Sequence, residues 1–431
     1  MEAFDRNQPF NQLPLLPPGI QLENDPQILK KLVSASRALA MVNSNVLRLP
    51  NPLMLVNTIA LQEAKTSTAI ENIFTTEDEL YKAISDTTKE ARANVATKEV
   101  LKYSEALWNG YNQLLSANEI NLELLISIFQ KIKSTNAGIR PPQAQVVIKR
   151  GESEFRPGEV VYTPPRGEQL LLTLLNNLKE YLNDDVNDTT DPLIKMCVAH
   201  YQFEAIHPFQ DGNGRTGRIM NLLYLIDKGL LAKPVLYLSK YIIQHKEDYY
   251  YKLGAVTTRG EWTPWVLYML DAVEKTSVLT NSLINDIVQQ MGATLELGKS
   301  KIKWYNKEVN EAIFSQPYCR FKTIGQAMQT TSRTTLTKYM SELEKAKILT
   351  PKKDGKEVYY VNDDLVRILE GWILGSRNRN LLDPTQAEVK FPVAFFYKIA
   401  LSDVGKTLTL FRLLFRPQGE RKLPLARAFS R

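Results

Sequence analysis

The residue types that could do chemistry concentrate in one stretch of twelve residues, from His207 to Arg218. Its glycines let backbone N–H groups converge on an anion, and a helix expected to begin near Gly214 offers its positive end to phosphates. Arg215 and Arg218, three apart on its first turn, suit phosphate oxygens. Asp211 can hold a Mg²⁺ between two phosphates, and His207 can accept a proton from an incoming hydroxyl. Base, metal ligand and anion-binding loop together indicate nucleotide phosphate chemistry.

Two other interpretations of this stretch are less favoured. Gly212, Gly214 and Gly217 also have the spacing of a dinucleotide-binding fingerprint, which requires a preceding strand in a βαβ unit. The residues before His207, however, have a helical pattern over 192–205. A purely structural loop would not need a histidine, an aspartate and two arginines so close together. The sequence therefore favours a site for nucleotide phosphates.

The elements around this loop are predicted to be mostly helical. Thr76 and Glu79 have the spacing of a capping box, which predicts a helix start. The β-branched runs at 146–148 and 160–162 predict a β-hairpin with a long loop. Further helical patterns cover residues 26–40, 53–73, 168–182, 192–205 and 214–229.

The part from 306 to 370 has a different pattern. We expect a helix ending near Gln316, a short one over 324–329, and a longer one capped by Ser332. Asp354 and Gly355 form a hairpin turn signal between two β-prone runs. Three helices followed by a hairpin are the outline of a winged helix-turn-helix.

The twelve residues match in full the signature of the Fic family, His-x-Phe-x-(Asp/Glu)-Gly-Asn-Gly-Arg-x-x-Arg. The resemblance extends over roughly 13–365, because Ser67, Glu71 and Asn72 match the family's inhibitory motif, (Ser/Thr)-x-x-x-Glu-(Gly/Asn). It implies a mainly α fold, with a helical Fic core, a β-hairpin flap and an appended winged helix-turn-helix. The implied domains are an inhibitory N-terminal segment at 1–110, the Fic core at 111–300, the winged helix at 301–375 and a basic tail at 376–431.

The resemblance also implies a role for each residue of the site. His207 resembles the general base that activates a Tyr, Thr or Ser hydroxyl of a target protein. Phe209 resembles a core anchor of the loop, and Asp211 the ligand of Mg²⁺. The hydroxyl would attack the α-phosphorus of ATP and release pyrophosphate. The implied ATP-binding residues are Gly212, Asn213, Gly214, Arg215, Thr216, Gly217, Arg218, Tyr250, Val146, Val147 and Ile148.

Glu71 is expected to inhibit this reaction by pairing with Arg218, the implied partner of the γ-phosphate. Without the motif it would be taken for an ordinary helix surface residue. With Ser67 and Asn72 at the matching spacing, the sequence predicts an autoinhibited protein adenylyltransferase. Two alternatives stay open: a Fic-type transferase of another nucleotide or of phosphate, and a DNA-binding regulator that senses a nucleotide.

Composition and charge limit the partners. The net charge is +7, and the tail from 376 to 431 accounts for all of it, with eleven Lys and Arg against four Asp and Glu. Two cysteines and the absence of a secretory signal or an apolar span favour a cytoplasmic protein without a membrane span. The resemblance of residues 13–80 to the N-terminal segment of many bacterial Fic proteins implies a bacterial source. The expected partners are a target protein, the chain itself as a substrate, and a second copy in a homodimer. DNA is a further candidate, through Arg333, Lys338, Lys352, Lys353 and Lys356.

Three other residues that could do chemistry are given ordinary structural roles. His200 is expected to be packed, since no second ligand lies at metal spacing. His245 is expected on a solvated face, and Cys197 in the core.

Overall fold

The computed structural model describes residues 4–47, 52–85, 87–150, 158–355 and 357–374. The basic tail at 376–431 and Lys356 lie outside these residues. Residues up to Leu374 group into one compact unit, so the expected division at 110 and 300 stays a prediction. Within the described part, no helix combines the length and apolar character needed to cross a membrane.

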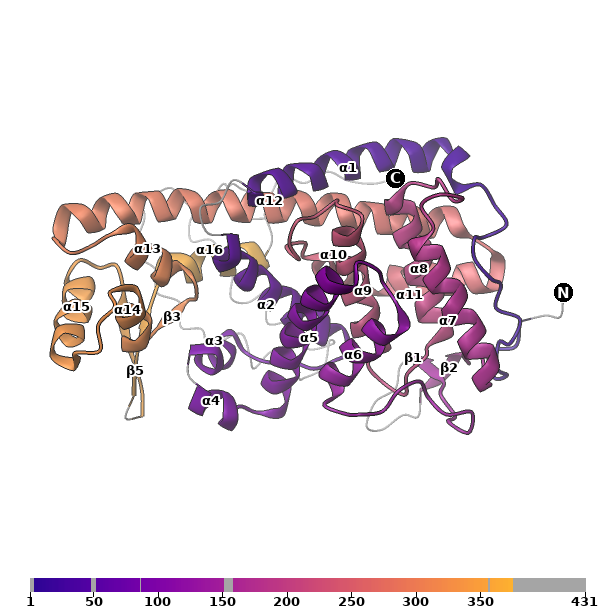
Figure 1. The fold of residues 1–431 in the computed structure, drawn as a ribbon, viewed down its shortest axis with the longest axis horizontal. Helices are drawn as coiled ribbons and strands as arrows, with labels where there is room; N and C mark the ends of the chain where they lie inside the picture. Colours follow the sequence, from indigo (N-terminus) through magenta and orange to yellow (C-terminus); the bar gives the residue numbers. More distant parts are fainter. Residues whose placement is uncertain (1–3, 48–51, 86, 151–157, 356, 375–431) are drawn as a thin grey trace, which may run out of the picture. The chain divides into compact units, whose positions relative to one another are not determined.

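The N-terminal third is a series of helices that precede the chemical loop. Asp25 opens the first long helix, which has Pro26 as its first residue, as expected of proline. The longest helix of the described chain, α12, runs alongside it (Figure 1). The capping box predicted at Thr76 is present, because Thr76 Oγ1 accepts from Glu79 N at 3.2 Å and Glu79 Oε2 from Thr76 N at 3.4 Å. The helices are α1 (Pro26–Leu47), α2 (Pro52–Ile70), α3 (Glu77–Ser85), α4 (Thr87–Arg92), α5 (Val95–Ala117) and α6 (Leu122–Lys133).

The middle of the chain is built around α8, all of whose residues from Leu193 to Ile206 are buried. It begins with Pro192 after the N-cap Asp191, whose Oδ1 accepts from Leu193 N at 2.8 Å, and it packs against α9, so the chemical loop lies between two core helices. The helices of this part are α7 (Glu168–Asn183), α8 (Pro192–Ile206), α9 (Asn213–Asp227), α10 (Leu238–Gln244), α11 (Lys246–Arg259) and α12 (Trp262–Lys301).

The expected β-hairpin is present but begins later than predicted. Its antiparallel strands are β1 (Ile148–Arg150) and β2 (Glu159–Tyr162), with Ile148 opposite Tyr162. Val146 and Val147, predicted as the start of the first strand, precede it. Beyond Tyr162 the chain continues Thr-Pro-Pro, and proline has no N–H to donate to a ladder. Continued in this register, Val146 would lie opposite Pro164 and Val147 opposite Thr163, whose carbonyl oxygen already accepts from Phe10 N at 3.0 Å. The pairing therefore stops at Ile148.

The C-terminal module, residues 307–374, has the predicted order of three helices and a hairpin. Ser332 caps the third helix by accepting from Thr335 N at 3.4 Å, and Gly355 turns the hairpin with a φ of +60°. A two-residue strand, which the sequence did not indicate, completes a sheet of order β3-β5-β4. The elements are α13 (Lys307–Phe314), β3 (Tyr318–Cys319), α14 (Phe321–Ala327), α15 (Arg333–Lys345), β4 (Thr350–Asp354), β5 (Glu357–Val361) and α16 (Asp363–Leu374).

The fold is thus mainly helical with small antiparallel sheets, as predicted. The winged-helix assignment of the C-terminal module stays a prediction that its element order favours.

Candidate active site

The conformation of the loop between α8 and α9 is fixed by side chains of the loop and of the first turn of α9. The ring of Phe209 is fully buried and stacks on Phe129 with centroids 4.2 Å apart, as expected of a core anchor. Asn213 clamps the loop from the first turn of α9: its Oδ1 accepts from Phe209 N at 2.9 Å and its Nδ2 donates to Phe209 O at 2.8 Å. Gly212 has a φ of +81°, which favours glycine. The Asn213 side chain therefore shapes the loop from inside.

The first turn of α9 lies against the segment that the sequence motif predicts to be inhibitory. We define this inhibitory segment as α2, α3 and the turn between them. A Cβ added to Gly214 would lie 2.6 Å from Oε1 of Glu71 and 2.9 Å from Nη1 of Arg218. Only a glycine lets these two groups approach the backbone so closely. Thr216 is buried, and its hydroxyl donates to Gly212 O at 2.9 Å. The N-terminal turn of α9 thus presents its backbone to one carboxylate and one guanidinium group.

Arg218 forms the expected ion pair with Glu71, and it also contacts Ser67. Its Nη2 donates to Glu71 Oε1 at 2.8 Å and to Ser67 O at 3.0 Å, and its Nε donates to Ser67 Oγ at 2.7 Å. Burial opposes the charge on Arg218, but Glu71, together with Tyr103 and Tyr249, raises the pKa of the guanidinium above its ordinary value. Asn72, with a φ of +61°, turns the chain directly after Glu71, which explains why the motif has Gly or Asn there.

Arg215 has a different partner. It is 1% exposed, and its Nη1 donates to Glu99 Oε2 of α5 at 2.6 Å. Both arginines were expected to suit phosphate oxygens because they are three positions apart on the first turn of the helix, yet their long side chains reach carboxylates in different parts of the chain. The structure therefore brings Arg218, and not Arg215, to the ion pair with Glu71.

His207 ends α8 in the left-handed conformation, with a φ of +51°. Its Nδ1 lies 3.3 Å from the carbonyl oxygen of Glu204, which can only accept, so Nδ1 carries the proton and Nε2 keeps a lone pair. Burial lowers the pKa of His207 to about 4, with the nearby Arg140 cation acting in the same direction. The imidazole is therefore neutral near pH 7 and able to accept a proton.

Titration of His207 tests this environment. Because the folded protein lowers the pKa, we expect the ring to stay neutral as pH falls from 7 to 5 and to protonate only near pH 4. The ring C–H chemical shift in NMR, assigned by its loss in a His207→Gln variant, would give the midpoint. A midpoint near 6.5, the ordinary value for histidine, would contradict a neutral base at this position.

Arg140 was not singled out from the sequence as a site residue, but it holds the loop. It is 3% exposed, its Nε donates to His207 O at 2.8 Å, and its Nη2 donates to Ile206 O at 3.3 Å and to Pro165 O. Through these bonds, one guanidinium joins the end of α8 to the segment that follows the hairpin. A single arginine beside a proline carries no pattern that reveals this role.

Glu204 is a second carboxyl group beside Arg218 that sequence reasoning missed. It is 7% exposed, and among the described residues its Oε1 has no hydrogen-bond partner. A Cβ on Gly217 would lie 2.7 Å from that atom, so Gly217 allows the close packing of α8 and α9. Burial raises the pKa of Glu204 to about 7, although Arg218 opposes the shift. Of these two carboxyl groups, Glu71 is the one that forms an ion pair with the guanidinium.

The other histidines and Cys197 have the environments that were expected. His200 is fully buried, lies 2.8 Å from the Tyr249 hydroxyl through Nε2, and stacks on Trp265. Burial lowers its pKa to about 3, so it is a neutral packed residue. His245 is exposed and Cys197 is buried.

Asp211 is the expected magnesium ligand. It lies at the rim of the loop with 66% of its side chain exposed, and its Oδ2 accepts from Lys133 Nζ at 2.6 Å. In the described part of the chain, no group of three or more His, Cys, Asp or Glu could hold a metal ion by itself. A lone ionised carboxylate still fits Mg²⁺ that arrives with a nucleotide, because phosphates and water supply most ligands in such sites.

Tyr250 and the hairpin lie next to this centre. Burial raises the pKa of Tyr250, and the neighbouring charge of Glu71 adds to the effect, while 42% of the residue stays exposed. Val147 is also 40% exposed. Arg150 of β1 pairs with Glu247 of α11 at 2.6 Å, which ties the hairpin to the helix that carries Tyr250.

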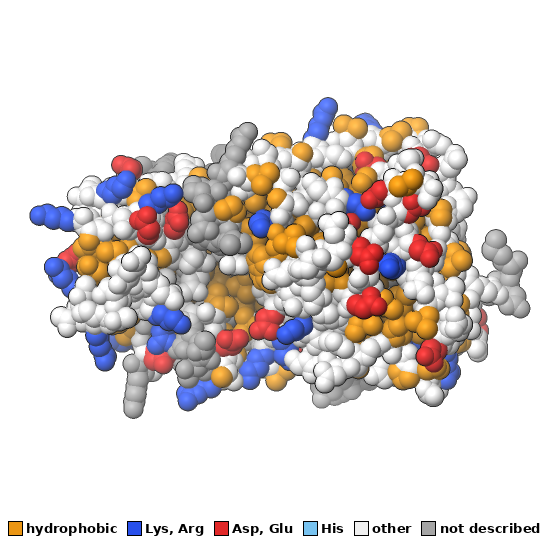
Figure 2. Space-filling model, in the orientation of Figure 1, with side chains coloured by type: hydrophobic (Ala, Val, Ile, Leu, Met, Phe, Trp, Pro, Cys, Tyr) orange, Lys and Arg blue, Asp and Glu red, His pale blue; other side chains and the backbone are white. Residues whose placement is uncertain are grey.

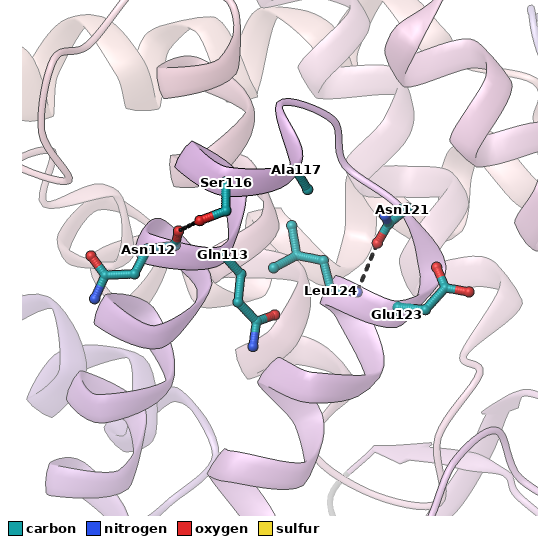
Figure 3. Close-up of a pocket in the computed structure, with 7 residues that line it drawn as sticks. All are labelled: Asn112, Gln113, Ser116, Ala117, Asn121, Glu123 and Leu124. Carbon is teal, nitrogen blue, oxygen red and sulfur yellow. Dashed lines mark hydrogen bonds between the residues drawn. The ribbon is translucent and has the colours of Figure 1, made fainter.

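A separate hollow lies between α5 and α6, away from the loop. It has a volume of about 570 Å³ and is lined mostly by neutral polar residues, among them Gln113, Ser116 and Asn121 (Figure 3). Neither a histidine nor a cationic side chain lines it, and its charged lining residue is Glu123. The loop between α8 and α9 is therefore the better candidate for chemistry.

Comparison with known proteins agrees with this site. A model of the Fic/DOC family N-terminal region matches residues 29–112, and a model of the Fic/DOC family matches 119–225. A third model, the C-terminal domain of SoFic-like protein adenylyltransferases, matches 289–365. The fold and the loop are thus those of a Fic-type protein, and residues 119–225 of this chain form a domain of the Fic/DOC family.

Curated relatives share part of the chain. The proteins named protein adenylyltransferase Fic from Drosophila yakuba and Drosophila melanogaster are each 30% identical to it over 189 residues, 42% of this chain. The matched part spans 36% of the length of those relatives. A crystal structure of a Fic family protein from Desulfovibrio desulfuricans G20 has the same fold, with a TM-score of 0.50 at 19% identity, covering 80% of this chain and 98% of that one.

Proposed function

We propose that this protein transfers AMP from ATP to a Tyr, Thr or Ser hydroxyl of a protein and releases pyrophosphate. The observation that carries the proposal is the neutral imidazole of His207 at the entrance of a loop whose helix presents Gly214 and Arg218 to an anion. The relatives from Drosophila are named for this activity.

Different residues have different roles in the proposed transfer. Nε2 of His207 takes the proton of the acceptor hydroxyl, whose oxygen forms a bond to the α-phosphorus as the bond to the pyrophosphate oxygen breaks. The backbone at the start of α9 balances the charge on the phosphate oxygens. Arg218, once freed from Glu71, is the cation proposed for the γ-phosphate.

Asp211 is the proposed ligand of Mg²⁺, which supplies positive charge to the phosphates when bound. Its ion pair with Lys133 keeps the carboxylate ionised, because that cation, against the effect of burial, lowers the pKa of Asp211. Lys133 would have to give up this contact when the metal binds.

The proposed resting state is autoinhibited. Glu71 forms an ion pair with the guanidinium of Arg218. Its carboxylate lies next to Gly214, where the negative phosphates of a nucleotide would otherwise lie. A nucleotide that enters beside Glu71 meets like charge and would be turned away from in-line attack.

The identity of the transferred group can be tested with labelled nucleotides. We expect a Glu71→Gly variant with Mg²⁺ to label proteins from α-labelled ATP and not from γ-labelled ATP, because AMP retains only the α-phosphate. Labelling from the γ-position would instead indicate a phosphate transferase. Preferential labelling from α-labelled UTP or GTP would replace AMP by another nucleotide.

The remaining partners stay predictions. Labelling of the chain itself in this experiment would establish self-modification. The contacts described test neither the formation of a homodimer nor the binding of DNA. Lys352, one of the expected DNA contacts, pairs with Asp78 at 2.6 Å, and on the face shown in Figure 2 basic and acidic side chains are interspersed over the C-terminal module. The cytoplasmic location also stays a prediction. The expected bacterial source gains no support from the curated relatives, which come from Drosophila species.

A further inference from the structure

A first chain of contacts runs from the C-terminal module to the inhibitory segment. Trp372 of α16 stacks on Tyr237, with ring centroids 4.3 Å apart and planes at 28°. The hydroxyl of Tyr237 hydrogen-bonds to that of Thr66 in α2. The indole N–H of Trp372 donates to Leu279 O of α12 at 3.2 Å, which fixes the ring. These rings and Thr66 are buried, so the contact is packed and water is kept out.

A second chain of contacts reaches the inhibitory segment through α3. Asp78 Oδ1 accepts from the Tyr318 hydroxyl of β3 at 2.7 Å and from Lys352 Nζ of β4 at 2.6 Å. The Tyr318 ring packs against Tyr81, with centroids 5.6 Å apart. The Tyr81 hydroxyl accepts in turn from Gln62 Nε2 of α2 at 3.0 Å. The small sheet of the module is thereby connected to α2 as well.

Both chains of contacts end shortly before the residues that hold Arg218. Gln62 and Thr66 are four residues apart, one turn of α2. Ser67 directly follows Thr66, and Glu71 is the first residue beyond the last turn of α2. A helix moves as a stiff element over so short a length, so a shift at 62 and 66 is passed to 67 and 71. The module thus contacts α2 at a place where small displacements move Glu71.

The core also holds α2 independently of the module. Buried Glu63 accepts from Ser239 N at 2.9 Å and from the Tyr103 hydroxyl at 3.3 Å. Removing a module contact should therefore loosen the segment without unfolding it, and the effect on Glu71 should be partial.

We propose that the C-terminal module holds the inhibitory segment against the active site, with Trp372 and Tyr318 acting as positioning residues for Glu71. This inference rests on the proposed autoinhibition, and it adds the part of the chain that controls it. Whatever displaces the module from α2 and α3 raises the population in which Arg218 is free for a nucleotide.

The test compares Trp372→Leu and Tyr318→Phe in the full chain, each with Glu71 present and with Glu71→Gly. With Glu71 present, we expect each change to raise AMP transfer about fivefold, as for the loss of one ring contact or hydrogen bond. In the Glu71→Gly background, neither should raise it further, because the inhibitory carboxylate is already gone. Amide hydrogen exchange over residues 60–72, measured without nucleotide, should be faster in both variants.

Tyr360→Phe is the matched control, since it removes a hydroxyl from the same small sheet where the ring packs on Phe321 within the module. It should change neither transfer nor exchange. The proposal is overturned if exchange at 60–72 is unchanged, or if the variants raise transfer equally without Glu71. Absence of AMP transfer by Glu71→Gly itself would contradict the proposed function instead, and the exchange measurement would still decide whether the module holds α2.

Discussion

Replacing Glu71 by glycine is expected to raise AMP transfer about a hundredfold, the usual cost of a misplaced reacting group. The change removes the carboxylate that lies 2.8 Å from Nη2 of Arg218 and directly over Gly214. Arg218 keeps its two bonds to Ser67 and so stays in place to meet phosphate oxygens. The measurement is the initial rate of protein labelling from α-labelled ATP with Mg²⁺.

Asn72→Gly is the control for this variant, because it introduces the same residue one position later, where the φ of +61° suits glycine. It should stay inhibited. Glu71→Gln keeps the shape but removes the charge, so it should fall between the wild type and Glu71→Gly. Equal rates for Glu71→Gly and the wild type would show that this ion pair does not limit the reaction.

The features that could be predicted from the sequence are those that depend on residues close together in the chain. The chemical loop could be recognised because its base, carboxylate, glycines and arginines lie within twelve residues. The helix starts at Thr76 and Ser332 could be placed because a cap acts through hydrogen bonds within one turn. The ion pair between Glu71 and Arg218 joins distant residues, and it became predictable only through the resemblance to a family motif.

The contacts that could not be predicted depend on which helices meet. By residue type and spacing alone, Arg215 and Arg218 look equivalent. The resemblance assigned Glu71 to Arg218, but the ion pair of Arg215 with Glu99 depends on where α5 packs and could not be predicted. Arg140 and Glu204 act through the packed end of α8, which no spacing reveals. Val146 was placed in a strand because of its β-branched run, but the prolines opposite it end the pairing.

Replacing His207 is expected to lower AMP transfer about a thousandfold, within the usual range for losing a general base. The comparison belongs in the Glu71→Gly background, where the rate is high enough to measure. Asparagine is the better substitution, because it tolerates the left-handed backbone at position 207, φ +51°, and cannot take the proton. The loss should appear in kcat, since the phosphate contacts made by the start of α9 and by Arg218 remain.

Two further measurements separate loss of the base from loss of the site. The His207→Asn variant should bind ATP with nearly unchanged affinity in calorimetry, because the imidazole acts on the acceptor hydroxyl and not on the phosphates. His245→Asn, at an exposed histidine of the same chain, should leave the rate unchanged. If His207→Asn kept most of the activity while binding ATP normally, the hydroxyl would lose its proton elsewhere, and the base would have to be sought among neighbouring groups, starting with Glu204, which burial places at a pKa of about 7.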